Sequence, residues 1–365
     1  MNRPWRAAML ALLLTGLGVA PVAAQQAADV ARAEAAIARA RTFIRDSIAR
    51  VGIPGVSITV LREGRVVWSE GIGWADLEQR VPVTPLTRFR IGSVSKPITA
   101  AAVGLLVEAG KLDLDAPVQR YVPGFPAKRH PVTTRLAAGH LAGIRHYEGD
   151  EFLSMRRYAS VAEGLSIFQD DSLLFRPGTR FLYSSYAWNL VSAVIEGASG
   201  RPFLAYMHEA VFRPLGMRQT AADHVDSIIP FRARWYTADS LNHITNAPYV
   251  DNSYKWAGGG FLSTTEDLAR FGQAMLDNAL FSAATFRLLT ASQRTLDGET
   301  TNYGIGWGTR RDSRGRITFG HSGGSTGGTA FLLVYPEQKL VVAVLANGDS
   351  PFVGATPIIA EMFLD

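Results

Sequence analysis

The hydrophobic pattern of the chain changes character several times before residue 72. An unbroken apolar run covers about Ala7 to Ala20, and from Asp29 to about Val51 apolar residues recur at helical spacing. The second stretch predicts an amphipathic helix packed on a flat surface. Its apolar face is expected to contain Val30, Ile37, Phe43, Ile44, Ile48 and Val51. After Pro54-Gly55, the segments 56–62 and 65–71 flank a Glu-Gly turn signal and predict a β-hairpin.

The C-terminal part shows the same strand-like character. Strands are predicted at 316–320, 329–335 and 340–347, with a helix from about Ala355 to Phe363. The middle, roughly 97–300, is mostly helical in pattern, with helices expected to begin near Pro97, Ala187, Phe203 and Thr265.

Strands from both ends of the chain can pair in one sheet. We therefore predict an α+β fold, with a five-stranded antiparallel sheet flanked by helices and an all-helical subdomain. The sheet part is expected at about 25–100 and 250–365, and the helical part at about 101–249.

The first 24 residues have the features of a secretory signal peptide. Arg3 and Arg6 precede the apolar run, and Val22-Ala23-Ala24 is a small-residue cleavage pattern. A membrane anchor is the alternative, but the run is shorter than the ~20 residues that a spanning helix needs. We expect a mature catalytic domain of residues 25–365, periplasmic or secreted, without stable membrane insertion.

Composition and charge narrow the function classes. The 365-residue chain has no cysteine, which excludes disulfides and a cysteine-linked lipid. Its formal net charge is +5, which falls by two without Arg3 and Arg6, and the charges are scattered apart from short runs such as Arg310-Arg311. This distribution does not favour nucleic-acid binding. A small-molecule or peptide substrate is the expected partner, and the oligomeric state stays open.

The most informative motif is Ser93-Val94-Ser95-Lys96, at the point where the sequence becomes helical. Residues three apart share a helix face, so Lys96 can reach the oxygen of Ser93. A lysine that loses its proton in a desolvated pocket is a suitable base for a serine nucleophile. The backbone N–H of Ser93, near a helix start, can also stabilise an oxyanion. The alternative is a serine that caps the helix beside a solvated lysine.

A second candidate segment is Tyr183-Ser184-Ser185, just before a predicted helix. Tyr183 can relay a proton if its hydroxyl faces Ser93 and a nearby ammonium favours the phenolate. The alternative is an aromatic side chain that covers the core of the helical part.

A third candidate segment is His321-Ser322-Gly323-Gly324, which ends a predicted strand. Glycines at a strand edge allow a substrate backbone to approach, and the N–H of Gly324 is a candidate second oxyanion donor. Residues 320–324 also match Gly-x-Ser-x-Gly, the nucleophile elbow of α/β-hydrolases. That motif requires a helix after the serine and a later histidine, whereas here a strand is predicted and His321 is the last histidine.

Two further patterns are assigned no catalytic or ligand-binding role. His140 and His146 lie six apart with no carboxylate at ligand spacing, so loop histidines are favoured over a metal site. Gly258-Gly259-Gly260 is not followed by the Lys-Ser/Thr of a phosphate loop, and it is expected to allow tight backbone packing beside the site.

In this order, the three candidate segments resemble the motifs of the penicillin-recognising serine hydrolases: β-lactamases, D,D-peptidases and their esterase relatives. Ser93-x-x-Lys96 resembles the first motif, Tyr183-x-Ser185 the Tyr-x-Asn motif of the class C branch, and His321-Ser322-Gly323 the Lys-Thr-Gly motif. The segments 181–185 and 255–260 are similar to the mitochondrial serine β-lactamase-like group. The resemblance spans about residues 40–350 and implies the same sheet-plus-helical fold.

Two departures from the family pattern bear on the substrate. Ser185 stands where the family has an asparagine that helps hold an acylamino group, and His321 stands where it has a lysine that helps bind a carboxylate. A neutral imidazole holds an anion more weakly than an ammonium does. The resemblance therefore favours an esterase or peptidase over an efficient β-lactamase.

The predicted reaction passes through an acyl-enzyme on Ser93, with Lys96 and Tyr183 sharing the acid and base roles. The N–H groups of Ser93 and Gly324 hold the oxyanion, and His321 orients Tyr183 or the substrate. Ser185, Ser322 and Gly323 are expected to contact the substrate, and no cofactor or metal is expected. The alternatives are a β-lactamase or D,D-carboxypeptidase proper, and an acylatable or degenerate binding or sensor protein without turnover.

Overall fold

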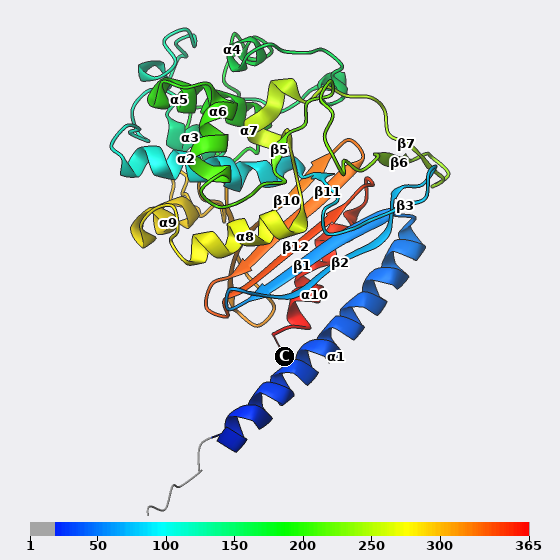
Figure 1. The fold of residues 1–365 in the computed structure, drawn as a ribbon. Helices are drawn as coiled ribbons and strands as arrows, with labels where there is room; N and C mark the ends of the chain where they lie inside the picture. The colour runs from blue at the N-terminus through cyan, green and yellow to red at the C-terminus, as the bar shows by residue number, and fades with distance from the viewer. Residues whose placement is uncertain (1–18, 365) are drawn as a thin grey trace, which may run out of the picture.

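A computed structural model of the protein describes residues 19–364 (Figure 1). A seven-stranded antiparallel sheet forms the lower half of the molecule in this view, and a region of helices and loops lies above one end of it. The strand order is β3-β2-β1-β12-β11-β10-β9, so the N-terminal hairpin and the C-terminal strands are joined through the β1–β12 pair. The α+β fold predicted from the sequence is confirmed.

The five long strands of the sheet are those that the sequence predicts. The strand bounds are β1 Gly55–Arg62, β2 Arg65–Asp76, β3 Val81–Pro82, β9 Gly308–Arg311, β10 Ile317–Ser325, β11 Gly328–Tyr335 and β12 Leu340–Ala346. The two edge strands β3 and β9 were not predicted, because segments this short carry no readable alternation. The third candidate segment lies inside β10 rather than after it.

Strand β12 shows how the sheet separates two hydrophobic cores. All seven of its residues are buried. Its odd-numbered side chains join the large core shared with the helical region, and its even-numbered side chains join a second core beneath α1 and α10. This period-two division is what a central strand covered on both faces requires.

Helices cover both faces of the sheet. The helices that face or flank it are α1 Val19–Val51, α8 Thr265–Leu276 and α10 Thr356–Glu361. The others are α2 Ser95–Glu108, α3 Thr134–Ala138, α4 Val161–Leu165, α5 Ser185–Ser199, α6 Phe203–Met207, α7 Trp256–Gly259 and α9 Ala283–Thr290. Helix starts were therefore predicted to within two residues at α2, α5, α6 and α8.

Short elements link these helices. The 3-10 turns are η1 Gly92–Val94, η2 Val118–Arg120, η3 Gly149–Leu153, η5 Ser253–Lys255 and η6 Pro351–Ala355, and η4 His208–Phe212 is a π-turn. Two small sheets pair β4 Phe89–Arg90 and β5 Ala221–Ala222 with β8 Phe261–Ser263, and β6 Tyr236–Ala238 with β7 Ile244–Asn246. The predicted helical part, 101–249, thus contains short strands as well, and its proposed boundaries stay a prediction.

The face that α1 buries agrees with the predicted one at four of six positions: Ile44 is buried, and Ile37, Phe43 and Ile48 pack partly buried against the second core. Ala36, Ala40 and Ile44, spaced four apart, are buried against the sheet, whereas Val30 and Val51 are exposed. Small side chains at this spacing let the helix backbone approach the sheet closely, so alanine rather than valine marks the contact. Figure 1 shows the N-terminal half of α1 extending beyond the sheet.

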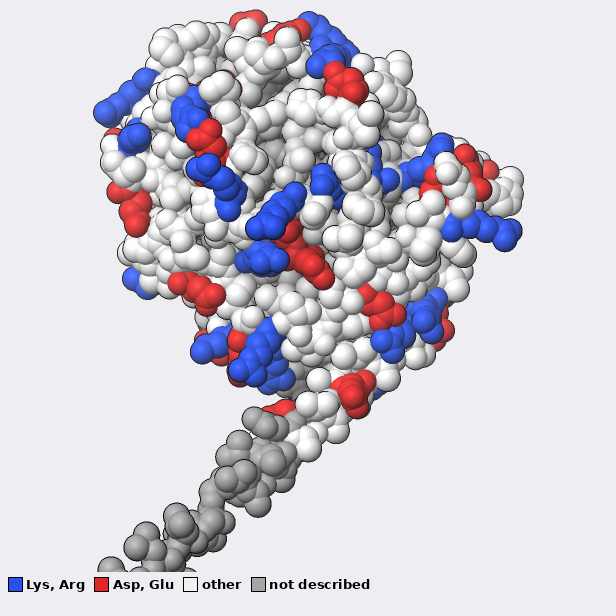
Figure 2. All heavy atoms as spheres, in the orientation of Figure 1, with Lys and Arg blue, Asp and Glu red and all other residues white. Residues whose placement is uncertain are grey.

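The predicted signal peptide, residues 1–24, falls mainly outside the described residues, so its cleavage stays a prediction. Within residues 19–364, no helix combines the length and the apolar character needed to cross a bilayer. On the face drawn in Figure 2, basic and acidic side chains are interspersed, and no patch of one sign covers it.

Candidate active site

The first candidate segment holds Ser93 and Lys96 on one turn, as the spacing predicts. Ser93 lies in the turn η1 and is half-buried, while Lys96 lies in the first turn of α2 and is fully buried. The Nζ atom of Lys96 is 2.9 Å from Ser93 Oγ. The alternative of a solvated lysine beside a helix-capping serine is therefore wrong.

Lys96 Nζ has two further partners besides Ser93. It donates hydrogen bonds to Ser185 Oγ at 3.1 Å and to the carbonyl oxygen of Gly258 at 2.6 Å. No carboxylate is among these partners. Burial, reinforced by the neighbouring ammonium of Lys255, holds the pKa of Lys96 well below the ordinary 10.5 of a lysine.

Glycines bring strand β10 directly against the nucleophile turn. A Cβ on Gly323 would lie 2.0 Å from the carbonyl oxygen of Ile91 and 3.0 Å from Ser93 N. A Cβ on Gly92, whose φ is +47°, would lie 2.6 Å from Gly324 N. Only glycine permits this approach. The backbone N–H groups proposed as oxyanion donors therefore belong to segments in contact with each other.

Tyr183 lies in the segment before α5, beside Ser93 and Lys96. Its hydroxyl is buried and makes no hydrogen bond of standard geometry within the described chain, although Ser93 and Ser185 lie close enough to favour the phenolate. Lys96 Nζ is 4.9 Å from the centre of the Tyr183 ring. Burial outweighs these neighbours and raises the pKa of Tyr183, so the phenol is favoured over the phenolate that was one condition for the proton relay.

His321 lies on β10 and is fixed by a tyrosine other than the expected one. Its Nε2 is 2.8 Å from the hydroxyl of Tyr303, and its Nδ1 contacts the carbonyl oxygen of Ser322. Since Nδ1–H must donate to a carbonyl, Nε2 accepts from Tyr303. Burial and the Lys96 charge lower the pKa of His321 to about 3, which keeps the half-buried ring neutral at pH 7. The ring of His321 lies 6.1 Å from that of Tyr183, but its hydrogen bond goes to Tyr303, so the expected role of orienting Tyr183 or the substrate stays a prediction.

The three residues expected to contact substrate occupy different positions. Ser322 is exposed, while Gly323 is buried against the nucleophile turn. Ser185 is buried, and its hydroxyl is engaged by Lys96. Ser185 therefore positions the lysine, in addition to lining the site.

The two histidines interpreted as loop residues hold the Tyr183 segment in place. His140 Nδ1 accepts from the N–H of Ser184 at 3.1 Å, and its ring lies 4.2 Å from that of Tyr183. His146 Nδ1 accepts from the N–H of Ser185 at 3.2 Å. Both pKa values are lowered by burial and by Lys96, that of His146 to about 4. Within residues 19–364, no cluster of three His, Asp or Glu side chains has the arrangement of a metal site.

Two cavities meet at Ser93. A small one of about 90 Å³ lies beside Ser185, Lys255 and Gly259, and a groove of about 860 Å³ runs along His321 and the β9–β10 edge. Ser93, Tyr183 and Gly324 line both. A bond held at Ser93 therefore has one half in a confined space and the other in an open one.

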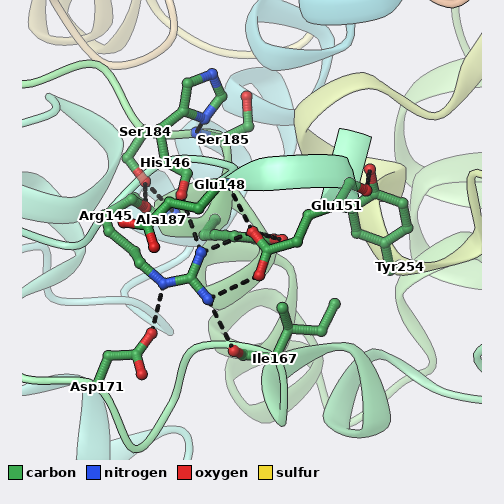
Figure 3. A network of polar contacts seen from close by, with 11 residues as sticks. Arg145, His146, Glu148, Glu151, Ile167, Asp171, Ser184, Ser185, Ala187 and Tyr254 are labelled. Carbon is green, nitrogen blue, oxygen red and sulfur yellow. Dashed lines mark hydrogen bonds and ion pairs between the residues drawn. The ribbon is translucent and has the colours of Figure 1, made fainter. Parts of the chain in front are cut away.

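A polar network holds the outer wall of the small cavity (Figure 3). The Arg145 guanidinium donates to both carboxylate oxygens of Glu151, at 2.7 and 2.9 Å, and to the carbonyl oxygen of Ile167 at 3.0 Å. Ser184 Oγ donates to the Arg145 carbonyl oxygen, and Tyr254 donates to that of Glu151. These bonds join the loop of residues 145–152 to the Tyr183 segment and to η5.

The sequence interpretation missed Tyr303, Lys255 and Arg145 as parts of this site. Lys255 carried a usable signal, because it is a charged residue between two aromatic residues in a run that continues into three glycines. Tyr303 and Arg145 carried none, since their partners lie on other segments of the fold.

Comparisons with known proteins agree with this geometry. Residues 40–362 match the family described as Beta-lactamase. The human protein "Serine beta-lactamase-like protein LACTB, mitochondrial" is 36% identical over 400 residues, covering 82% of this chain and 73% of its own. Penicillin-binding protein 4* of Bacillus subtilis is 28% identical, covering 78% of this chain and 66% of its own.

A solved structure extends the similarity to the fold. The octameric penicillin-binding protein homologue from Pyrococcus abyssi superposes with a TM-score of 0.76 at 27% identity, covering 90% of this chain and 76% of that one. The resemblance stated from the three motifs is thereby confirmed. Since the family match spans most of the chain and includes the Ser93–Lys96 pair, this chain belongs to the β-lactamase family of serine hydrolases.

Proposed function

We propose that this protein is an exported hydrolase that cleaves an ester or amide bond through an acyl-enzyme on Ser93. The observation that carries the proposal is the 2.9 Å contact between Ser93 Oγ and the buried Lys96 Nζ, a lysine without a carboxylate partner. Such a lysine is a base in its neutral form, and a base next to a hydroxyl makes a nucleophile.

The three partners of Lys96 match the needs of a neutral amine. Its two N–H groups donate to Ser185 Oγ and to the Gly258 carbonyl oxygen, and its lone pair accepts from the Ser93 hydroxyl. In the acylation step, the Ser93 proton passes to Lys96 as Oγ bonds to the carbonyl carbon. The sequence left open which group takes the first proton, and the proposal assigns it to Lys96.

Tyr183 is proposed as the acid for the leaving group. Its raised pKa favours the phenol, which gives its proton to the departing oxygen or nitrogen and regains one from the Lys96 ammonium. The N–H groups of Ser93 and Gly324 hold the carbonyl oxygen while it is negative. Water then attacks the acyl-enzyme by the same route, with Lys96 as base, and restores Ser93.

Two features favour an ester or peptide over a β-lactam. His321 is neutral, so it does not supply the cation that the family lysine gives to a substrate carboxylate. Ser185 offers a single short hydroxyl, which already accepts from Lys96, in place of the amide of an asparagine. A β-lactamase or D,D-carboxypeptidase proper is therefore the second candidate, and the intact Ser93–Lys96 pair argues against a degenerate binding protein. Export to the periplasm or medium rests on residues 1–24.

Intact mass after treatment with a fluorophosphonate tests the proposal, with Ser93→Ala as the matched variant. One adduct on the wild type and none on the variant is the expected result. If a well-folded wild type is not labelled, Ser93 is not an activated nucleophile and the proposed hydrolase function is wrong. Hydrolysis of a chromogenic cephalosporin at the rate of good esters would support the second candidate instead.

A further inference from the structure

A second buried lysine lies in the small cavity beside the nucleophile. Lys255 is the last residue of η5, is only 2% exposed, and lines the same cavity as Ser93. Within residues 19–364, its ammonium makes no hydrogen bond and no salt bridge. Its three N–H donors therefore have no acceptor.

Aromatic rings surround this lysine without supplying acceptors. Lys255 Nζ lies 4.3 Å from the centre of the Phe152 ring, 5.2 Å from that of Tyr254 and 5.6 Å from that of Tyr147. Ring faces favour a cation over a neutral amine. The Arg145–Glu151 contacts drawn in Figure 3 hold the loop next to Phe152 in place.

The carboxylate whose charge acts on Lys255, Asp223, already has other partners. Asp223 Oδ2 accepts from Arg90 at 2.7 Å and from Asn252 at 2.9 Å, and its other oxygen is 3.9 Å from Arg232. Two guanidinium groups and Lys255 thus share one negative charge. None of the described residues that line the small cavity is acidic. A buried cation without its own counterion favours an anion from outside.

We propose that Lys255 binds a carboxylate on the acyl part of the substrate, in the small cavity next to Ser93. The assignment rests on the proposed acyl-enzyme and names its substrate class: esters or amides of short acids with a second, anionic end.

The two cavities decide which half of the substrate carries the anion. The leaving group departs while the acyl group is still bound to Ser93, so it needs the open groove of about 860 Å³. The acyl group stays on the confined side. A cavity of about 90 Å³ has room for about three water molecules, or for a short chain that ends in a carboxylate.

A matched pair of methyl esters tests this assignment. Monomethyl succinate and methyl 4-methylpentanoate have acyl chains of equal length, and an isopropyl group replaces the carboxylate in the second. The release of acid at constant pH gives kcat/KM for each. We expect the wild type to favour monomethyl succinate by about tenfold or more, the usual size of a charged hydrogen bond in a buried site.

The variants separate binding of the anion from other roles of Lys255. Lys255→Met should bring the ratio of the two kcat/KM values close to one. Lys128→Met is the control, because Lys128 also lies over a ring, 5.4 Å from the centre of Phe125, but lines neither cavity. It should keep the wild-type ratio. If Lys255→Met does not fold, Lys255→Gln and the wild-type ratio carry the test.

Other outcomes would contradict either the anion site or its place on the acyl side. Ser93-dependent hydrolysis of both esters without a preference would overturn the anion site and leave the proposed function intact. Equal losses on both esters in Lys255→Met would show that Lys255 acts only through Lys96. A carboxylate preference for acetoxyacetate over isobutyl acetate, lost in Lys255→Met, would place the anion on the leaving group and overturn the acyl-side assignment. If no ester is hydrolysed, the same pair is compared as protectants of Ser93 against fluorophosphonate, with the same expected ratio.

Discussion

Two buried lysines near the nucleophile have opposite surroundings: Lys255 lines the small cavity, and Lys96 lies behind it, bonded to Ser93. Lys96 is fully buried among three hydrogen-bond partners, two of them hydroxyl groups. Lys255 is almost as buried but is surrounded by rings and has no acceptor among the described residues. Polar partners that can accept or donate suit a lysine that gains and loses a proton. A cage of rings suits one that keeps its charge for an external anion.

The two pKa values support this division. Burial lowers both, but the pKa of Lys255 falls only to about 7, since Asp223 partly offsets burial and the Arg90 charge. That of Lys96 falls well below 10.5, with the charge of Lys255 adding to burial. The charge of Lys255 therefore helps to keep Lys96 neutral.

The largest expected effect comes from removing the base. Lys96→Met should lower kcat/KM for a neutral ester by about 10²–10⁴-fold, because general bases contribute on that scale. The measurement is steady-state hydrolysis of an uncharged ester, with the folded state checked by circular dichroism. The decrease in kcat/KM for the same ester should be far smaller in Lys255→Met. Wild-type turnover by the Lys96 variant would contradict the assignment of the first proton transfer.

A large effect is also expected where β10 meets the nucleophile turn. In Gly323→Ala, the new Cβ would lie 2.0 Å from the Ile91 carbonyl oxygen, so β10 must move away from Ser93. Losing one oxyanion donor costs about 10²–10³-fold in kcat, and we expect a decrease of that size with the fold retained. Gly124→Ala is the control, because no atom lies within 4 Å of the place that its new methyl group would take. Equal activity of the two variants would contradict the role of the contact.

The Ser93–Lys96 contact could be predicted from the sequence, whereas the approach of Gly323 to Ile91 could not. The Ser93–Lys96 pair is local, so its spacing on one helical turn was sufficient to predict the contact. The approach of Gly323 to Ile91 joins segments more than two hundred residues apart, and the sequence indicated only that glycine permits close packing.

Protonation states were the least predictable part of the site. The proton relay through Tyr183 was made conditional on an ammonium that favours the phenolate, but the pKa also depends on how deeply the hydroxyl is buried, and only the fold sets that. His321 was expected to orient Tyr183 or the substrate, and its hydrogen bond to Tyr303 was not predicted, because Tyr303 lies in none of the three motifs. The five long strands, in contrast, follow from local apolar patterns and turn signals, and the central strand β12 is predicted from an apolar run.

A smaller effect is expected on the pH dependence of kcat/KM for a neutral ester. Lys96 must be neutral, so activity rises as pH increases through its pKa. The Lys255 charge lowers that pKa, and in Lys255→Met the pKa of Lys96 should rise, which moves the acidic limb of the profile to higher pH. Lys128→Met should leave the limb in place. If the limb in Lys255→Met stays in place or moves to lower pH, the charge of Lys255 does not influence the pKa of Lys96.

The histidines near Lys96 do not obscure this measurement. Burial and Lys96 lower the pKa values of His146 and His321, to about 4 and about 3, and that of His140 lies well below its ordinary 6.5. All three rings are therefore neutral throughout the neutral pH range, where Lys255 itself titrates. A shift of the limb in that range reports on the lysines.

The smallest expected effect tests the support of His321, which lies on the open side of the nucleophile rather than in the cavity. Tyr303→Phe removes the hydroxyl that donates to His321 Nε2 and leaves the ring acceptor without this partner. A lost hydrogen bond of this kind is worth about 1 kcal/mol, or about fivefold. If His321 positions the leaving group in the groove, the change should appear in kcat/KM for esters of large alcohols and not for methyl esters, whose leaving group is too small to extend along the groove to His321. Equal losses on both kinds of ester would instead mean that the Tyr303–His321 pair supports Ser93 itself, and the division between a confined acyl side and an open leaving-group side would no longer hold.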